Sequence, residues 1–201
     1  MYAQLLMAAS FAMAAYQDVR DRAVSDFVWI PGVAGAVYSI YWAFPNAEFP
    51  IAKLALVAVA ALVFTMLGGI GQADAIALVL ISADPYNLSP IFPLLAAAAV
   101  MAIHIAYEFL VGNARGAKTI PMEKFLREQR WIPKAILSDG TRKEVSKDVN
   151  KARDEVEASN KHGALVEVTY GVPTVAYLGV GYVAYLVWML LFNQAVFFSL
   201  P

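Results

Sequence analysis

Residues 91–111 read IFPLLAAAAVMAIHIAYEFLV, an apolar run that holds one acidic residue, Glu108, and no Lys or Arg. A helix needs about 20 residues to cross roughly 30 Å of hydrocarbon, so this run has the length of a membrane span. Similar apolar runs lie on both sides of it. We read six spans in all, at residues 2–16, 27–44, 51–67, 74–83, 91–111 and 172–198.

The composition agrees with a bilayer environment. The chain of 201 residues is 60% hydrophobic and 15% charged, which is too much apolar surface for a soluble domain of this size. No Lys or Arg precedes the first span, so we expect it to stay in the protein and not to be a cleaved signal. The absence of cysteine excludes disulfides, thiolate metal sites and a cysteine nucleophile.

The basic residues are concentrated in two places. Of 15 Lys and Arg residues, 12 lie between residues 112 and 165, and Arg20 and Arg22 follow the first span. Basic loops tend to stay in the cytoplasm, so six spans would place both termini outside, and the joints at residues 45–50 and 84–90 would face out as well. This orientation predicts that Asp18 and Asp74 reach the same, cytoplasmic, membrane face.

The fold class predicted is an all-α polytopic membrane protein, with six transmembrane helices and a small cytoplasmic α+β subdomain between spans five and six. We expect residues 1–111 to form helices one to five, residues 112–169 the subdomain, and residues 170–201 the last helix. Within the subdomain, a helical stripe predicts a helix over residues 143–160, and branched or aromatic residues predict strands at 131–137 and 165–170. The stripe consists of Val145, Val149, Ala152 and Val156.

Asp74 is the first candidate functional residue. It lies in GGIGQADA, residues 68–75, where small residues surround one charge just before an apolar run. An ionisable group at membrane depth is a functional candidate, because its burial is costly. The alternative is that Asp74 only caps a helix by accepting free backbone N–H groups. The residues alone leave both interpretations open.

Asp18 is the second candidate, in YQDVRDR at residues 16–22. If one helix continues through this segment, Arg22 lies four residues on and can pair with Asp18. Two carboxylates that come close together do not both ionise easily, and such a pair can divide the acid and base roles of an aspartyl protease. The alternative is a solvated loop, and it stays open.

Three sequence blocks together resemble the archaeal preflagellin and prepilin peptidases, which are class III signal peptidases of the Gly-x-Gly-Asp type of membrane aspartyl protease. The first block is AAYQDVRDR at residues 14–22, with Val24, Asp26 and Trp29 after it. The second is GQAD at residues 71–74, and the third is YGVPT at residues 170–174, followed by Gly179 and Gly181. The blocks occur in the family's order.

The resemblance implies an aspartic endopeptidase of the cell membrane, with Asp18 and Asp74 as its catalytic pair. Its substrates would be archaellin or pilin precursors, which it would cut at the cytoplasmic face to remove a short basic leader. Partners would be these precursors and the lipid bilayer, without nucleic acid. We expect no cofactor and no metal. The bacterial relatives' cysteine-rich insert has no counterpart here, so we expect cleavage without N-methylation.

The chain departs from the family pattern at two positions. Ala73 replaces the last glycine of Gly-x-Gly-Asp, and alanine disfavours positive φ, so the active-site loop with Gly69, Gly71 and Ala73 could be shifted. Ile76 stands where many relatives carry Lys.

Other polar residues near the spans have two readings each. Asp21 and Asp26 are candidates for attracting the basic leader, against the reading that they are solvated surface charges. His104 and Glu108 are four residues apart and can pair on a helix, although we favour a snorkelling Glu108. Pro173, Gly171, Gly179 and Gly181 favour close helix packing over a flexible last span.

Two other classes of function compete. A presenilin-like protease would cut inside the hydrophobic segment, but the Pro-Ala-Leu motif of those enzymes does not occur in this sequence. A transporter or assembly scaffold would use Asp18 and Asp74 as proton or cation sites, yet transporter sites lie near the bilayer midplane. The predicted position of both aspartates at one interface favours hydrolysis.

Overall fold

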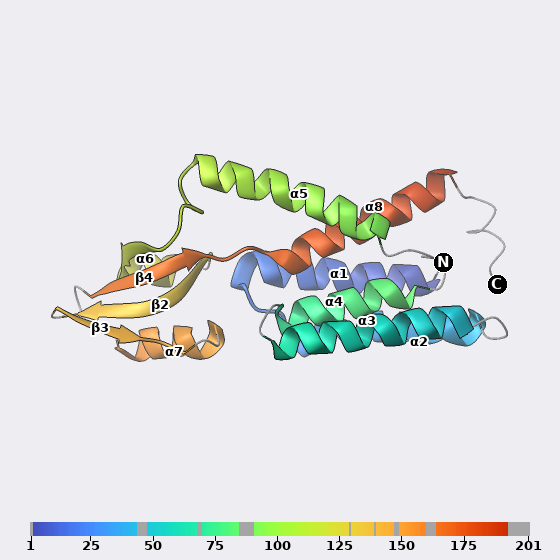
Figure 1. The fold of residues 1–201 in the computed structure, drawn as a ribbon, viewed down its shortest axis with the longest axis horizontal. Coiled ribbons are helices and arrows are strands. Elements are labelled where there is room, and N and C mark those ends of the chain that lie inside the picture. Colours follow the sequence, from blue (N-terminus) through green and yellow to red (C-terminus); the bar gives the residue numbers. More distant parts are fainter. Residues whose placement is uncertain are drawn as a thin grey trace. The chain divides into compact units, whose positions relative to one another are not determined.

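A computed structural model describes residues 2–43, 48–67, 70–84, 91–128, 130–138, 140–146, 149–159 and 164–192. Contacts divide the chain into two compact units. The helical unit comprises residues 1–18, 24–101 and 174–201, and the sheet unit comprises residues 19–23 and 102–173. Figure 1 shows the helices of the first unit and the small sheet of the second.

A helix occurs at each of the expected places. These helices are α1 (Tyr2–Asp21), α2 (Ile30–Ala43) with the short 3-10 turn η1 (Asp26–Trp29) before it, α3 (Glu48–Met66), α4 (Gln72–Ala83), α5 (Ile91–Leu110) and α8 (Thr174–Phe192). Within the described residues, α5 and α8 are long and apolar enough to cross a membrane, whereas the apolar parts of α3 and α4 are shorter. The remaining four of the six expected spans stay a prediction, and residues 193–198 of the last one lie outside the described part.

The core of the helical unit is built from α1, α4 and α8 together with residues of η1, α2 and α5. Its fully buried members include Met7, Phe11, Ala77, Ile81 and Tyr182. The rings of Phe11 and Tyr182 pack with their centroids 5.1 Å apart. Because these side chains come from elements far apart in sequence, their packing brings the start of α4, the end of α1 and the start of α8 into one unit.

Glycines permit the closest helix contacts in this unit. A Cβ atom at Gly181 would overlap the carbonyl oxygen of Pro93, so α8 and α5 approach closely there. At Gly179 a Cβ would meet Phe11 at 3.4 Å, an ordinary contact distance. The expectation that Gly181 serves close helix packing is therefore confirmed.

The sheet unit is a four-stranded antiparallel sheet in the order β1-β4-β2-β3. Its strands are β1 (Lys118–Pro121), β2 (Trp131–Ser138), β3 (Thr141–Glu144) and β4 (Leu165–Tyr170), and its helices are α6 (Met122–Arg127) and α7 (Val149–Ser159). Val166 and Val168 alternate with exposed or half-buried neighbours along β4 and are fully buried, as a strand with one covered face requires. They join a core with Phe125, Trp131 and Val156.

Both predicted strands of this unit are confirmed, whereas the predicted helix is displaced. The helix begins at Val149 and not at residue 143, because Thr141–Glu144 form a strand paired with β2. Gly140, with φ at 72°, supplies the turn between the two strands. The strands β1 and β3 and the helix α6 were not predicted, since each is only four to six residues long.

Candidate active site

Asp18 is a buried residue near the C-terminal end of α1. Its side chain and backbone are 8% exposed, and its Oδ2 accepts a hydrogen bond of 3.1 Å from the backbone N–H of Ala176. Ala176 lies in the first turn of α8, where backbone N–H groups have no partner within the helix and attract anions. Asp18 therefore does not lie in a solvated loop, and it connects α1 to the start of α8.

Asp74 lies in the first turn of α4 and is half-buried. Its Oδ2 accepts a hydrogen bond of 3.2 Å from the backbone N–H of Gly71, the residue that precedes the helix. The helix-capping interpretation of Asp74 is thus realised in the structure. Capping also fixes the carboxylate at the helix start, so the two interpretations are compatible.

The two carboxylates belong to the same helical unit, one near the end of α1 and the other at the start of α4, within range of a weak electrostatic interaction. Each carboxylate is held by a backbone N–H group of a helix start, one at α8 and the other at α4. Two carboxylates that approach each other are suited to share a proton and to activate a water molecule.

The glycine-rich segment before Asp74 is partly described. Gly69 lies outside the described residues. Gly71 has an extended conformation with φ at −73°, and a Cβ there would stand 3.1 Å from the Asp74 Oδ2. Ala73 lies within α4, so a helical φ is all that this position requires. Position 73 therefore needs no positive φ, and alanine suits a helix better than glycine does. The expectation of a shifted loop stays a prediction.

Asp21 and Asp26 are both exposed, the former as the last residue of α1 and the latter as the first of η1. Asp21 pairs with Arg20 at 3.4 Å, and both side chains are largely exposed. This geometry agrees with solvated charges, and their role in leader binding stays a prediction. The assumption of a helix continuing through Arg22 is wrong, because α1 ends at Asp21 and Arg22 is left-handed with φ at 54°.

Glu108 is buried and hydrogen-bonded within the sheet unit. His104 Nε2 lies 3.2 Å from Glu108 Oε1, and Asn113 Nδ2 donates to Glu108 Oε2 at 2.7 Å. The Tyr170 hydroxyl lies 3.4 Å from His104 Nε2. The pairing of His104 with Glu108 is confirmed, and the snorkelling interpretation is wrong because Glu108 is only 8% exposed.

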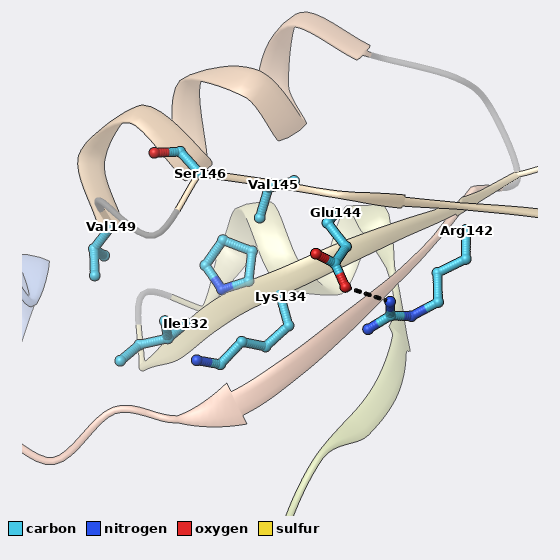
Figure 2. Close-up of a pocket in the computed structure, with 8 residues that line it drawn as sticks. Ile132, Lys134, Arg142, Glu144, Val145, Ser146 and Val149 are labelled. Atoms are coloured by element: carbon cyan, nitrogen blue, oxygen red, sulfur yellow. Dashed lines mark hydrogen bonds and ion pairs between the residues drawn. The ribbon is translucent and has the colours of Figure 1, made fainter.

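A cavity of about 350 Å³ lies in the sheet unit, between the β2–β3 hairpin and the start of α7. Figure 2 shows Lys134 and the Arg142–Glu144 ion pair on its wall, with Ile132 and Val149 at one side. Arg142 also pairs with Glu167, at 2.9 Å. The positive charge of Arg142 on the cavity wall is thus balanced by two carboxylates, those of Glu144 and Glu167.

Ala176 and Asp84 make contacts in the helical unit that were not predicted from the sequence. Ala176 contributes only its backbone N–H, which no residue type reveals. Asp84 was expected in an outward-facing joint, yet it is fully buried and hydrogen-bonded to Tyr182. A usable signal for Asp84 was available, namely the single Lys53 within an otherwise apolar run, since a charge in a span requires a partner.

The two long apolar helices and the two carboxylates at helix ends are typical of a helical membrane protein with a candidate acid–base pair. The profile of the type IV leader peptidase family matches residues 5–107, which is more than half of the chain. The chain therefore belongs to the type IV leader peptidase family. It is a peptidase, and the peptidases of this family are in general of the aspartic type. Asp18 and Asp74 both lie within the matched residues. No curated protein and no solved structure matches the chain.

Proposed function

We propose that the protein is a multi-pass membrane aspartyl endopeptidase in which Asp18 and Asp74 form the catalytic pair. It removes the short basic leader of archaellin or pilin-like precursors at the cytoplasmic face, without N-methylation and without a cofactor. In this proposal all six apolar helices span the bilayer, with both termini outside. Gly71 and Ala73 belong to the segment that presents Asp74, and Asp21 and Asp26 attract the basic leader.

One observation carries the proposal. Within the residues that match the family, two acidic side chains from separate helices of one compact unit each lie at a helix end, within range of an electrostatic interaction. Both are held by backbone N–H groups, Asp18 by Ala176 and Asp74 by Gly71. Backbone donors on helix starts are rigid, so the carboxylates are oriented before a substrate binds.

The chemistry follows from the pair. The ionised carboxylate takes a proton from water, and the resulting nucleophile attacks the scissile carbonyl while the protonated carboxyl polarises that carbonyl oxygen. The proton then passes to the leaving amine. Neither carboxylate can perform both roles in one turnover, so each of them is required.

Cleavage of a leader-bearing precursor tests the assignment. Membranes with the wild-type chain, Asp18→Asn or Asp74→Asn are incubated with a precursor that has a short basic leader. Each asparagine variant should lose activity by at least about 100-fold, since acid–base catalysis contributes roughly 10²–10⁴-fold. Asp154→Asn, which alters an exposed carboxylate on α7, is the matched control and should cleave at the wild-type rate.

Three outcomes would contradict the proposal. Full cleavage by either asparagine variant would remove the pair from catalysis. Cleavage inside the hydrophobic segment would favour a presenilin-like enzyme. A third result would favour a scaffold: the wild-type chain cleaves no precursor, and the Asp18→Asn and Asp74→Asn variants still support assembly of the precursor proteins.

A further inference from the structure

A fully buried carboxyl group lies at the opposite end of α4 from Asp74. Asp84 directly follows the helix and is fully buried. The hydroxyl of Tyr182, on α8, donates to Asp84 Oδ2 at 3.2 Å. Lys53 Nζ, on α3, donates to the backbone oxygen of Asp84 at 2.9 Å. Three helices therefore meet at one charged residue.

This cluster is costly to disturb. A carboxylate in an apolar core is tolerated only with hydrogen bonds or an opposite charge, and Asp84 has the Tyr182 hydroxyl and the ammonium group of Lys53 nearby. Sliding α4 along α8 would separate Tyr182 from Asp84 and remove the hydroxyl donor of a buried carboxyl group. The cluster therefore resists a change in the relative position of these two helices.

The same two helices hold the proposed catalytic pair. Helix α4 carries Asp74 in its first turn, about 15 Å along the axis from Asp84 at 1.5 Å per residue. Helix α8 carries Ala176 in its first turn, which binds Asp18, about 9 Å along the axis from Tyr182. Because helices are stiff over such lengths, a contact between their distal parts also sets the separation of their starts.

We propose that the hydrogen bond from Tyr182 to Asp84 sets the position of Asp74 relative to Asp18. Tyr182 and Asp84 are positioning residues, because neither of them reaches the reacting atoms. The inference rests on the proposed function for its catalytic consequence. Its structural part, the placement of α4 against α1 and α8, can be measured without any substrate.

The chain offers a matched pair of variants on α8. Tyr182→Phe deletes the hydroxyl that binds Asp84 and keeps the ring that packs on Phe11. Tyr185→Phe deletes a second buried hydroxyl one turn further, which has no hydrogen-bond partner among the described residues. Only the first variant removes a bond between α8 and α4.

The position of the pair is measured with nitroxide labels. The natural chain has no cysteine, so Tyr16→Cys and Gln72→Cys together give one label site on α1 and one on α4. Both residues are exposed and lie two positions before Asp18 and Asp74, which stay intact. Pulsed electron paramagnetic resonance then reports the distance distribution between the two labels in the full chain in detergent.

In this labelled background, Tyr182→Phe should shift or widen the distance distribution, and Tyr185→Phe should leave it unchanged. In the cleavage assay, Tyr182→Phe should lower kcat roughly 10-fold or more with KM little changed, since a displacement of about 1 Å can cost two orders of magnitude. A smaller folded fraction would also lower the apparent kcat at unchanged KM, so kcat is divided by the folded fraction of each variant, and the effect of Tyr182→Phe should remain after this correction.

A second pair of variants covers the possibility that Tyr182→Phe does not fold. Asp84→Asn keeps an acceptor oxygen for Tyr182 and should retain the wild-type distance distribution, whereas Asp84→Leu, of similar size, should not. Equal distributions in all variants would overturn the inference. A wild-type chain that cleaves no precursor but still shows the Tyr182→Phe shift would refute the proposed function and leave the positioning role intact.

Discussion

Asp18 and Asp74 each accept a hydrogen bond from a backbone N–H group, but the donor of Asp74 is near in sequence and that of Asp18 is distant. Asp74 accepts a hydrogen bond from the residue that precedes its own helix, so its orientation is a local property of residues 71–74. Asp18 accepts from Ala176, which is 158 positions away in sequence. The orientation of Asp18 therefore depends on the docking of α8 against α1, while that of Asp74 depends only on the start of α4.

Replacement of Ala73 by glycine tests whether the departure from Gly-x-Gly-Asp matters. Ala73 is helical, so Ala73→Gly should destabilise the protein by up to about 1 kcal/mol and leave cleavage activity close to that of the wild type. The thermal midpoint in detergent and the rate of leader removal measure the two effects. A large gain in activity with glycine would show that position 73 requires a conformation that alanine cannot adopt.

At the scale of single elements, α8 is held at three places in the helical unit. Its first turn binds Asp18 through Ala176, its middle binds Asp84 through Tyr182, and Gly181 permits the close approach of α5. Helices in lipid gain little from apolar contacts alone, because the acyl chains are equally apolar. The glycine and the hydrogen bonds therefore determine where α8 lies.

Substitution of Gly181 tests the close approach of α8 and α5. Gly181→Ala should lower the thermal midpoint and the cleavage rate, because the new Cβ would overlap the Pro93 carbonyl oxygen and also lie 2.9 Å from the Ala97 Cβ. The expected loss is about 1–3 kcal/mol, typical of overpacking. Gly179→Ala is the matched control on the same helix, since its Cβ would meet Phe11 at 3.4 Å. Equal effects of the two substitutions would contradict the packing argument.

In the sheet unit, Glu128 makes stability depend on pH. Burial raises the pKa of Glu128, but hydrogen bonds from Trp131 and Arg130 and the positive charges of Arg130 and Lys124 outweigh burial and bring the pKa below its usual 4.5. A carboxyl with a lowered folded pKa stabilises the fold above its unfolded pKa, and this contribution is lost as pH falls through the folded value. The contribution should thus be complete at neutral pH and disappear below pH 4.5.

The variant Glu128→Gln isolates this contribution. At pH 7 its thermal midpoint should lie below that of the wild type, and the difference should shrink as the pH falls below about 4.5, where both side chains are uncharged. Glu123→Gln, which alters an exposed carboxylate on the neighbouring helix α6, serves as the control. A difference independent of pH would show that the negative charge of Glu128 does not stabilise the fold.

For the whole molecule, the division into two units follows the distribution of charge. Most basic residues belong to the sheet unit, whereas Lys53, in the helical unit, lies beside the backbone of Asp84. Apolar side chains such as Leu56, Ile103 and Leu191 are exposed on long helices, as expected for surfaces that contact lipid. The proposed orientation, with the basic segment in the cytoplasm, rests on this asymmetry.

Labelling of single cysteines tests the orientation, since the natural chain has none. In intact cells, a membrane-impermeant maleimide should react with Tyr2→Cys, at the exposed start of α1. Glu123→Cys, exposed on α6, should react only after permeabilisation. Both variants should react with a permeant maleimide as the control. Labelling of Glu123→Cys in intact cells would contradict a cytoplasmic sheet unit.

Hydropathy, alternation and short motifs are local properties of a chain, and they were enough to predict the helical class, the strands at Trp131 and Leu165 and the family. The pairing of His104 with Glu108, four residues apart on one helix, was open to the same reasoning. The hydrogen bond from Ala176 to Asp18 and the burial of Asp84 against Tyr182 were not. Each of these two features joins residues of different elements, and such contacts arise from packing, which no local pattern encodes.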